Sequence, residues 1–362
     1  MKITVLAGGV GGSRFVLGLR EAVRRRADAQ AGAAVGERPG GASPDEITVV
    51  VNTGDDVWLA GVRLMPDFDS LLYALAGVND TERGWGRAGE TERVAAELRE
   101  WGVSWPWFTL GDLDLGTHLA RTAWLREGLT PSQVGDRLQR RWPLGARLVP
   151  ATDTEVDTWV TVDAAALGDS VAGAPADAPP PDGAPTRAAM HFQEWWTRHR
   201  AAVPALAFTQ RNLASARPAP GVVEAIEGAD VVLVAPSNPV VSIGTIVAVP
   251  GIREALAATS APVVGVSPII GGRVVRGMAD ACLPVIGVET SAEAVGRHYG
   301  ARSGGGIIDG WLVDETDASA LGPLAEAGLV AAAVPLWMRD VDTSAALAEA
   351  ALELAGALPT VE

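Results

Sequence analysis

The chain has 362 residues, 48% of them hydrophobic and 20% charged, which is enough apolar material for a buried core and argues against disorder. Its 29 basic and 44 acidic side chains leave a formal net charge of −15, so duplex nucleic acid is an unsuitable partner, because phosphate binding needs a basic face. Cys282 is the only cysteine, which excludes a disulfide framework and a cysteine-ligated metal cluster within one chain.

The N-terminus runs directly from a short apolar stretch into glycines and lacks the long apolar region and cleavage site of a signal peptide. No stretch of about 18 uncharged apolar residues is present that could cross a membrane. We therefore expect a cytoplasmic protein without a membrane partner.

Four short runs rich in Val, Ile and Leu are typical of parallel strands that are buried on both faces. These runs occupy residues 2–7, 47–51, 230–235 and 262–266. Each ends in a cluster of small or polar residues, and helical patterns lie between them. Ligands bind outside the carboxyl ends of parallel strands, so the four clusters should line one site. The predicted fold class is α/β, with a Rossmann-like parallel sheet.

A tryptophan-rich region separates the second strand from the third. Ten of the twelve tryptophans fall between Trp58 and Trp196. Helical patterns occupy residues 69–77, 90–101, 117–128 and 130–142, and the last begins with a capping box. We predict one α/β domain over residues 1–362, with its core at about 1–65 and 205–335. Residues 66–200 are then a mainly helical insertion.

Two stretches have the composition of solvated loops, namely residues 29–45 and the Pro/Ala-rich stretch at 168–188, which we expect to be flexible. The second is predicted to join two strands at 158–162 and 189–192.

The first polar cluster is glycine-rich and contains Gly8, Gly9, Gly11 and Gly12. Exposed N–H groups and the dipole of the following helix favour an anion at such a place, so phosphate or nucleotide binding is predicted. The pattern is not Walker A, since no Gly-Lys-Ser/Thr follows, and Arg14 takes the third glycine position of a dinucleotide fingerprint. A tight turn without a ligand is the alternative.

Carboxylates follow the second strand, at Asp55 and Asp56, and recur after a short connection at Asp69. Carboxylates near a strand end suit a divalent cation such as Mg²⁺. Asp67 or Asp69 could instead cap the next helix, and Asn52 could simply form a turn.

Two further clusters carry weaker signals. Asp112, Asp114 and Thr117 form an acidic loop before a helix, where capping is an equal alternative to substrate binding. Ser237 and Asn238 follow the third strand and could contact a base edge or a phosphate, or form a proline-stiffened turn.

Three other features favour structural roles. His118, alone at a helix start, is more often structural than catalytic. The aromatic stretch at residues 191–196 could form a stacking platform, although core packing is the better interpretation. Cys282 has no basic neighbour in sequence and is expected to be a buried apolar residue.

With these motifs the chain resembles the 2-phospho-L-lactate transferases (CofD type), and within that family the actinobacterial phosphoenolpyruvate transferase branch of coenzyme F420 biosynthesis. The matching segments lie at residues 6–12, 51–58, 66–69, 83–86, 191–196, 235–244, 267–271 and 277–280. They follow family order from residue 1 to about 316, and the last ~45 residues carry little of the resemblance.

The resemblance implies a Mg²⁺-dependent enzyme, usually a homodimer, that transfers a phospho-organic-acid group from a diphospho-guanosine ester to the ribityl hydroxyl of the deazaflavin Fo and releases GMP. For this branch the donor is enolpyruvyl-diphospho-5'-guanosine and the product is dehydro coenzyme F420-0; lactyl-2-diphospho-5'-guanosine is the alternative donor. A nucleotidyltransferase and a non-catalytic protein that senses nucleotide sugars are the rival hypotheses.

The resemblance also implies residue roles. It places Mg²⁺ on Asp55, Asp56 and Asp69, and gives catalytic roles to Asp69 and Asp56, with Asp69 the first candidate to orient the Fo hydroxyl. Substrate contacts are implied for Gly8, Gly9, Gly11, Gly12, Arg14, Asn52, Asp112, Asp114, Thr117, Ser237, Asn238, Ser267 and Pro268. The chain departs from the family at Leu113, where an arginine is usual. Either Arg83, Arg87 or Arg121 substitutes for it, or the loop takes a different position in this chain.

Overall fold

A computed structural model describes residues 1–33, 45–103, 107–170 and 187–358. Its centre is a seven-stranded sheet in the order β14-β13-β10-β9-β1-β2-β5, in which every neighbouring pair is parallel. These strands are β1 Lys2–Ala7, β2 Glu46–Val51, β5 Arg147–Pro150, β9 Val231–Val234, β10 Val263–Val266, β13 Gly310–Val313 and β14 Val330–Ala333. The predicted α/β fold with a Rossmann-like parallel sheet is confirmed.

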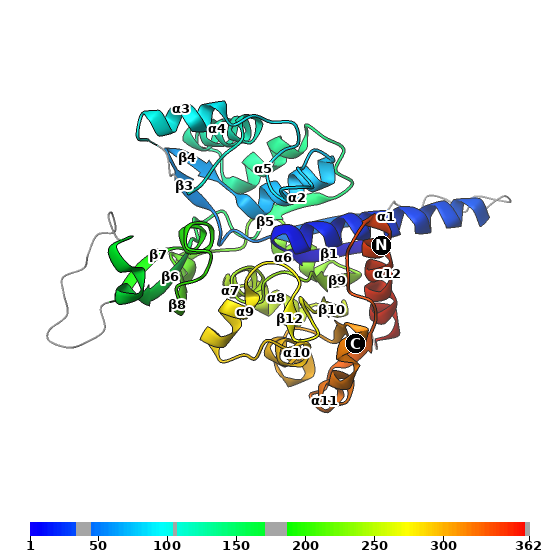
Figure 1. Cartoon of the computed structure of the whole chain (residues 1–362). Coiled ribbons are helices and arrows are strands. Elements are labelled where there is room, and N and C mark those ends of the chain that lie inside the picture. Colours follow the sequence, from blue (N-terminus) through cyan, green and yellow to red (C-terminus); the bar gives the residue numbers. More distant parts are fainter. Residues whose placement is uncertain (34–44, 104–106, 171–186, 359–362) are drawn as a thin grey trace.

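Helices cover both faces of this sheet, as Figure 1 shows. They are α1 Gly9–Ala33, α2 Pro66–Ala76, α3 Arg93–Glu100, α4 Asp112–Arg126, α5 Pro131–Gln139, α6 Val222–Glu227, α7 Ile243–Ala248, α8 Ile252–Ala258, α9 Ala279–Cys282, α10 Ala292–Tyr299, α11 Leu321–Glu326 and α12 Val341–Ala357. Residues of α1, α2, α5 and α12 share one hydrophobic core with one face of the sheet, and residues of α6 to α11 share the other.

The near-continuous apolar composition of the strands follows from this double cover. Successive side chains of a strand point to opposite faces, so Val5 enters the core on the α1 side while Leu6 enters the core on the α8 side. Both side chains are fully buried. Each strand therefore needs an apolar residue at almost every position, which is the pattern that identified the strands in the sequence.

Residues 66–200 contain the four predicted helices, and also strands. β5 lies in this range and pairs with β2 at the edge of the main sheet. The range further includes the two predicted strands, β6 Thr158–Asp163 and β7 Arg187–His191, which pair with each other antiparallel. On its other side β6 pairs antiparallel with β8 Ala205–Gln210. These three strands form the green projection of Figure 1.

Both predicted loops are shorter than expected. Helix α1 continues to Ala33, so residues 29–33 are helical, and the rest of that predicted loop up to residue 44 lies outside the described residues. A short 3₁₀ helix, Ala164–Ser170, covers the start of the second predicted loop, and β7 covers its end. Residues 171–186 lie outside the described residues.

The direction of the connections creates a crevice between β1 and β9. From β1 the chain adds β2 and β5 on one side, and it then crosses to β9 and adds β10, β13 and β14 on the other. At such a reversal of strand order, the loops after the two central strands diverge and leave room for a ligand at the carboxyl ends. Among the described residues, no helix is both long and apolar enough to span a membrane.

Candidate active site

A cavity of about 1150 Å³ lies at the carboxyl ends of β1, β2, β9 and β10. Sites for single drug-sized ligands usually measure ~300–1,000 Å³, so this cavity has room for two ligands side by side. From the predicted set it is lined by Gly8, Gly9, Gly11, Arg14, Asp55, Asp69, Asp114, Ser237, Asn238, Ser267 and Pro268. Gly12, Asn52, Asp56, Asp112 and Thr117 do not line it.

The glycines follow the end of β1 and form the first turn of α1, which begins at Gly9. A Cβ atom on Gly8 would lie 2.4 Å from Oδ2 of Asp67, and one on Gly11 would lie 2.5 Å from the carbonyl oxygen of Pro236. The N–H of Gly8 donates to Oγ of Ser237 at 3.0 Å, and that hydroxyl donates back to the Gly8 carbonyl at 2.7 Å. Only glycine permits this close approach between the ends of β1, β9 and α2.

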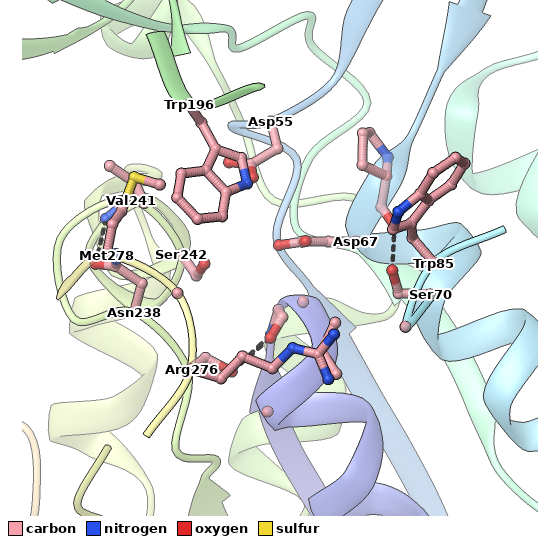
Figure 2. A pocket seen from close by; sticks show the side chains of 18 of the residues that line it. Asp55, Asp67, Ser70, Trp85, Trp196, Asn238, Val241, Ser242, Arg276 and Met278 are labelled. Atoms are coloured by element: carbon pink, nitrogen blue, oxygen red, sulfur yellow. Dashed lines mark hydrogen bonds between the residues drawn. The ribbon is translucent and has the colours of Figure 1, made fainter. Parts of the chain in front are cut away.

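Asp55 and Asp67 are two buried carboxylates that face the same open space (Figure 2). The side-chain amide of Asn52 donates to Oδ1 of Asp55 at 3.2 Å and to Oδ2 of Asp67 at 2.8 Å. The N–H of Gly54 donates to the amide oxygen of Asn52, which fixes the direction of the amide. Asn52 therefore acts on the site through the two carboxylates that it holds in place.

The environment of this pair favours a positive charge between the two groups. Burial raises the pKa of Asp67 to about 6, against the hydrogen bonds from Asn52 and the Gly9 N–H. Burial and the charge of Asp67 raise the pKa of Asp55 well above its usual range. From sequence, Asp67 is considered only as a possible cap of the next helix. Its sequence signal, a second carboxylate two residues before Asp69, does not tell which of the two faces the cavity.

Asp56 lies behind the site rather than in it. It is buried with an oxygen 3.7 Å from Nη2 of Arg63, and its other oxygen has no hydrogen-bond partner among the described residues. Burial raises the pKa of Asp56, against the charge of Arg63. The predicted catalytic and metal-binding roles of Asp56 do not fit this position.

Asp69 belongs to a buried network of charged side chains at the α2–α4 wall of the cavity. It forms an ion pair with the fully buried Arg121, whose Nη1 donates to Nδ1 of His118 at 2.9 Å. Nε2 of His118 lies 3.3 Å from Oδ1 of Asp114, which also accepts the hydroxyl proton of Tyr73 at 2.7 Å. His118 therefore connects Arg121 with Asp114 in this network, and it also lines the cavity.

The network leaves one oxygen of Asp69 without a partner. Burial raises the pKa of Asp69, while the charge of Arg121 opposes the rise. The Oδ2 atom of Asp69 makes no hydrogen bond among the described residues, although it lies 3.6 Å from Nδ1 of His118. Ligand atoms of Asp69, Asp114 and His118 lie within 4.8 Å of one another, but Arg121 already supplies a cation to Asp69.

The predicted acidic loop at residues 111–118 is the beginning of α4. Gly111 has an extended backbone before the first turn, and Asp112 and Asp114 lie in that turn, where carboxylates favour the helix dipole. Asp112 accepts the N–H of Val94, in the first turn of α3, at 3.1 Å, and so lies between two helices instead of in the cavity. Thr117 is buried outside the cavity lining.

The replacement of the usual arginine by Leu113 removes no charge from the cavity. Leu113 is 43% exposed and lies outside the lining. Of the three arginines proposed to compensate, Arg83 lines the cavity. Arg87 stacks on Trp142 and Tyr73, and Arg121 is committed to Asp69.

The opposite wall comes from β9, β10 and the residues that follow them. Asn238 lines the cavity with its Oδ1 accepting the N–H of Val240 at 2.9 Å. The Ser267 hydroxyl donates to the carbonyl of Ile269 at 2.9 Å. Behind them the Cys282 thiol is buried, which raises its pKa to about 12, so the expected apolar role of Cys282 is confirmed.

The aromatic stretch at residues 191–196 divides between the hydrophobic core and the cavity wall. Trp195 is fully buried and donates to the carbonyl of Val203, as a core residue does. Trp196 is 39% exposed and lines the cavity next to Asp55 (Figure 2). Both tryptophans lie in a single turn of π-helix, Glu194–Arg198, in which their side chains point in different directions. Such turns are frequent at functional sites.

Comparison with known proteins gives a consistent family assignment. Residues 3–334 match the family described as 2-phospho-L-lactate transferase CofD. The chain is 49% identical over 356 residues to the phosphoenolpyruvate transferase of Mycolicibacterium smegmatis, covering 98% of this chain and 99% of that protein. It is 49% identical over 355 residues to the phosphoenolpyruvate transferase of Thermobifida fusca, covering 98% of each. A Bacillus halodurans crystal structure of the UPF0052 family shares the fold, with a TM-score of 0.58 and 17% identity over 97% of this chain and 98% of that one.

Proposed function

This chain belongs to the 2-phospho-L-lactate transferase CofD family, and we propose that it is a phosphoenolpyruvate transferase of coenzyme F420 biosynthesis. It would transfer the phosphoenolpyruvyl group of enolpyruvyl-diphospho-5'-guanosine to the ribityl hydroxyl of Fo, giving dehydro coenzyme F420-0 and GMP. The observation that carries the proposal is the 49% identity to phosphoenolpyruvate transferases along nearly the whole chain. A cavity with room for two ligands suits a donor and an acceptor.

The chemistry consists mainly of positioning and charge stabilisation. Phosphoryl-type transfer needs the attacking oxygen in line with the leaving group, and fixed donors toward the phosphate oxygens. The N-terminal turn of α1, beginning at Gly9, offers backbone N–H groups and a helix dipole to a diphosphate. Asn238, Ser267 and Pro268 line the wall beside it and would contact the guanosine or the Fo ring.

Asp55 and Asp67 fit a Mg²⁺ ion better than the originally predicted set does. They are two buried carboxylates that share one amide donor, have raised pKa values and form no ion pair among the described residues. Mg²⁺ is typically held by one or two carboxylates together with substrate phosphates. When bound, the ion would neutralise charge on the transferred phosphoryl group.

Asp69 suits the orientation of the acceptor hydroxyl. Its Oδ1 is held by Arg121 and its Oδ2 has no hydrogen bond within the described part of the chain, so a hydroxyl donor can be accepted without breaking a contact. Arg121 is then a positioning residue, since it acts only through Asp69. The cavity wall at Trp196 and Trp107 would shield the donor from water.

The proposal is tested by incubating the purified protein with Fo, Mg²⁺ and each diphospho-guanosine donor in turn, with product analysis by mass spectrometry. Dehydro coenzyme F420-0 and GMP are expected from the enolpyruvyl donor. Turnover of the lactyl donor alone would move the protein to the other branch. Tight nucleotide binding without turnover of either donor would favour the nucleotide-sensing alternative. A homodimer in the cytoplasm is the setting that the family resemblance implies.

Mg²⁺ should bind more tightly as the pH rises through about 6. The folded-state pKa of Asp67, about 6, lies above its ordinary value of 3.8, so the cation-free protein keeps a proton there that the ion must displace. In the cation-free protein, ionisation of this carboxyl lowers the free energy of unfolding as the pH rises from about 4 to 6. Bound Mg²⁺ should restore that stability. We expect a larger Mg²⁺-induced rise in melting temperature at pH 7.5 than at pH 5.5. An equal rise at both pH values would remove Asp67 from the ion site.

A further inference from the structure

Two arginines form part of a wall between the main cavity and a smaller one. The smaller cavity has a volume of about 330 Å³ and lies beside α1 and α2. Arg14 of α1 and Arg276, which follows β12 (Arg273–Val274), line both cavities. Figure 2 shows Arg276 reaching across the main cavity, with its guanidinium on the opposite side of the open space from Asp55.

Neither guanidinium has an anionic partner among the described residues. Arg14 donates a hydrogen bond to the carbonyl of Met338 at 3.2 Å. Arg276 makes no hydrogen bond or ion pair with any of the described residues. The two arginines are neighbours, since both line the same two cavities, and partial burial together with the charge of Arg14 lowers the pKa of Arg276. In contrast, Arg83 on the same cavity is paired with Asp80 and Glu92.

The guanidinium of Arg276 contacts the part of the cavity wall that contains Gly84. A Cβ atom on Gly84 would lie 1.9 Å from Nη2 of Arg276, so the guanidinium packs directly on the Gly84 backbone, where φ is +79°. The cavity therefore has carboxylates on one wall and unpaired guanidiniums on another. In a chain with net charge −15, two close cations without a counter-charge are stabilised by a bound anion.

We propose that Arg14 and Arg276 bind the carboxylate of the group that is transferred. The inference rests on the proposed function, because that donor carries one carboxylate in addition to its two phosphates. The α1 turn and a cation at Asp55 and Asp67 serve the phosphates, which leaves the carboxylate without a partner. The planar, forked guanidinium matches a carboxylate in a bidentate pair. These arginines would then distinguish the complete donor from a guanine nucleotide that lacks the carboxylate.

The test compares two ligands on one variant. In Arg276→Gln, the Kd of the enolpyruvyl donor, measured by titration calorimetry with Mg²⁺, should rise about 10- to 100-fold, the effect of losing a charge-assisted pair. The Kd of GDP should stay within about twofold of the wild-type value. Arg14→Gln should show the same split. Arg297→Gln is the matched control, since Arg297 lies on α10 outside both cavities, paired with Glu293, and its replacement removes the same charge.

Two results would overturn the inference. An equal loss of GDP affinity would assign the guanidiniums to the diphosphate, and an unchanged donor Kd would assign them no ligand. Arg276 is exposed, so the variant should fold, which its melting temperature would verify. Binding is measured without turnover, so the outcome is separate from the product assay: an inactive wild-type protein refutes the transferase proposal, whereas an active enzyme with an unchanged Arg276→Gln refutes only this inference.

Discussion

Asp55→Asn is expected to lower kcat for transfer by at least about 100-fold while leaving the fold intact. The substitution keeps the size of the side chain and removes the carboxylate that shares the Asn52 amide with Asp67. Charge stabilisation of a phosphoryl group by a preorganised site accounts for effects of this size. Because burial raises the pKa of Asp55 well above its ordinary value, its ionised form destabilises the cation-free protein. The variant should therefore melt at the wild-type temperature or above it without Mg²⁺.

Asp56→Asn is the informative comparison for that variant. Asp56 is adjacent in sequence, equally buried and also has a raised pKa, but it faces Arg63 and not the cavity. We expect its kcat to stay within about fivefold of the wild-type value. Steady-state rates of GMP release under saturating Mg²⁺ would measure both variants. If the two lose activity equally, the assignment of the cavity carboxylate to Asp55 is wrong.

Four of the five strands inside the sheet could be predicted from sequence because they are buried on both faces; β13, Gly-Trp-Leu-Val, is equally buried but was not predicted. Such strands are almost wholly apolar, and the four predicted runs are the four central or near-central strands β10, β9, β1 and β2. The edge strands lacked that signal. β14 is Val-Ala-Ala-Ala and is only partly buried, and β5 includes Arg147 and Pro150, which are tolerated at an edge. Their pairing depends on neighbours that are distant in the sequence.

The site was predictable in its location but not in its details. Polar clusters after parallel strands must meet at one edge of the sheet, which brought Gly8, Asp55, Ser237 and Ser267 to one cavity. Neighbouring residues diverge in direction once the chain leaves a strand, so the sequence could not separate Asp55 from Asp56.

Contacts between side chains that are far apart in the chain could not be predicted from the sequence either. The partner of Asp69 is Arg121, which lies 52 residues further along the chain. Besides Asn52, a second side-chain amide donates to Asp55, and it comes from Gln193, 138 residues away. Only the packing of α2 against α4, and of the 191–196 stretch against the end of β2, creates these contacts.

Arg121→Met is expected to cause the largest loss of stability, about 3–5 kcal/mol in free energy of unfolding at pH 8, the typical cost of removing one partner of a buried ion pair. Arg121 is fully buried, and its charge opposes the rise in the pKa of Asp69 that burial causes. Without Arg121, that folded-state pKa should rise further above its unfolded value. The loss should therefore grow as the pH rises above about 4, and be smaller at pH 5 than at pH 8.

Urea unfolding at the two pH values would measure this dependence. Arg137→Met, which removes a largely exposed guanidinium on α5, is the matched control and should barely change the free energy of unfolding. Adding Asp69→Asn to Arg121→Met should recover part of the loss, because the uncompensated carboxylate is then gone. A loss that is the same at pH 5 and pH 8, with no recovery in the double variant, would mean that Arg121 stabilises the protein by packing alone. Its role in holding Asp69 for the acceptor hydroxyl would then have no electrostatic basis.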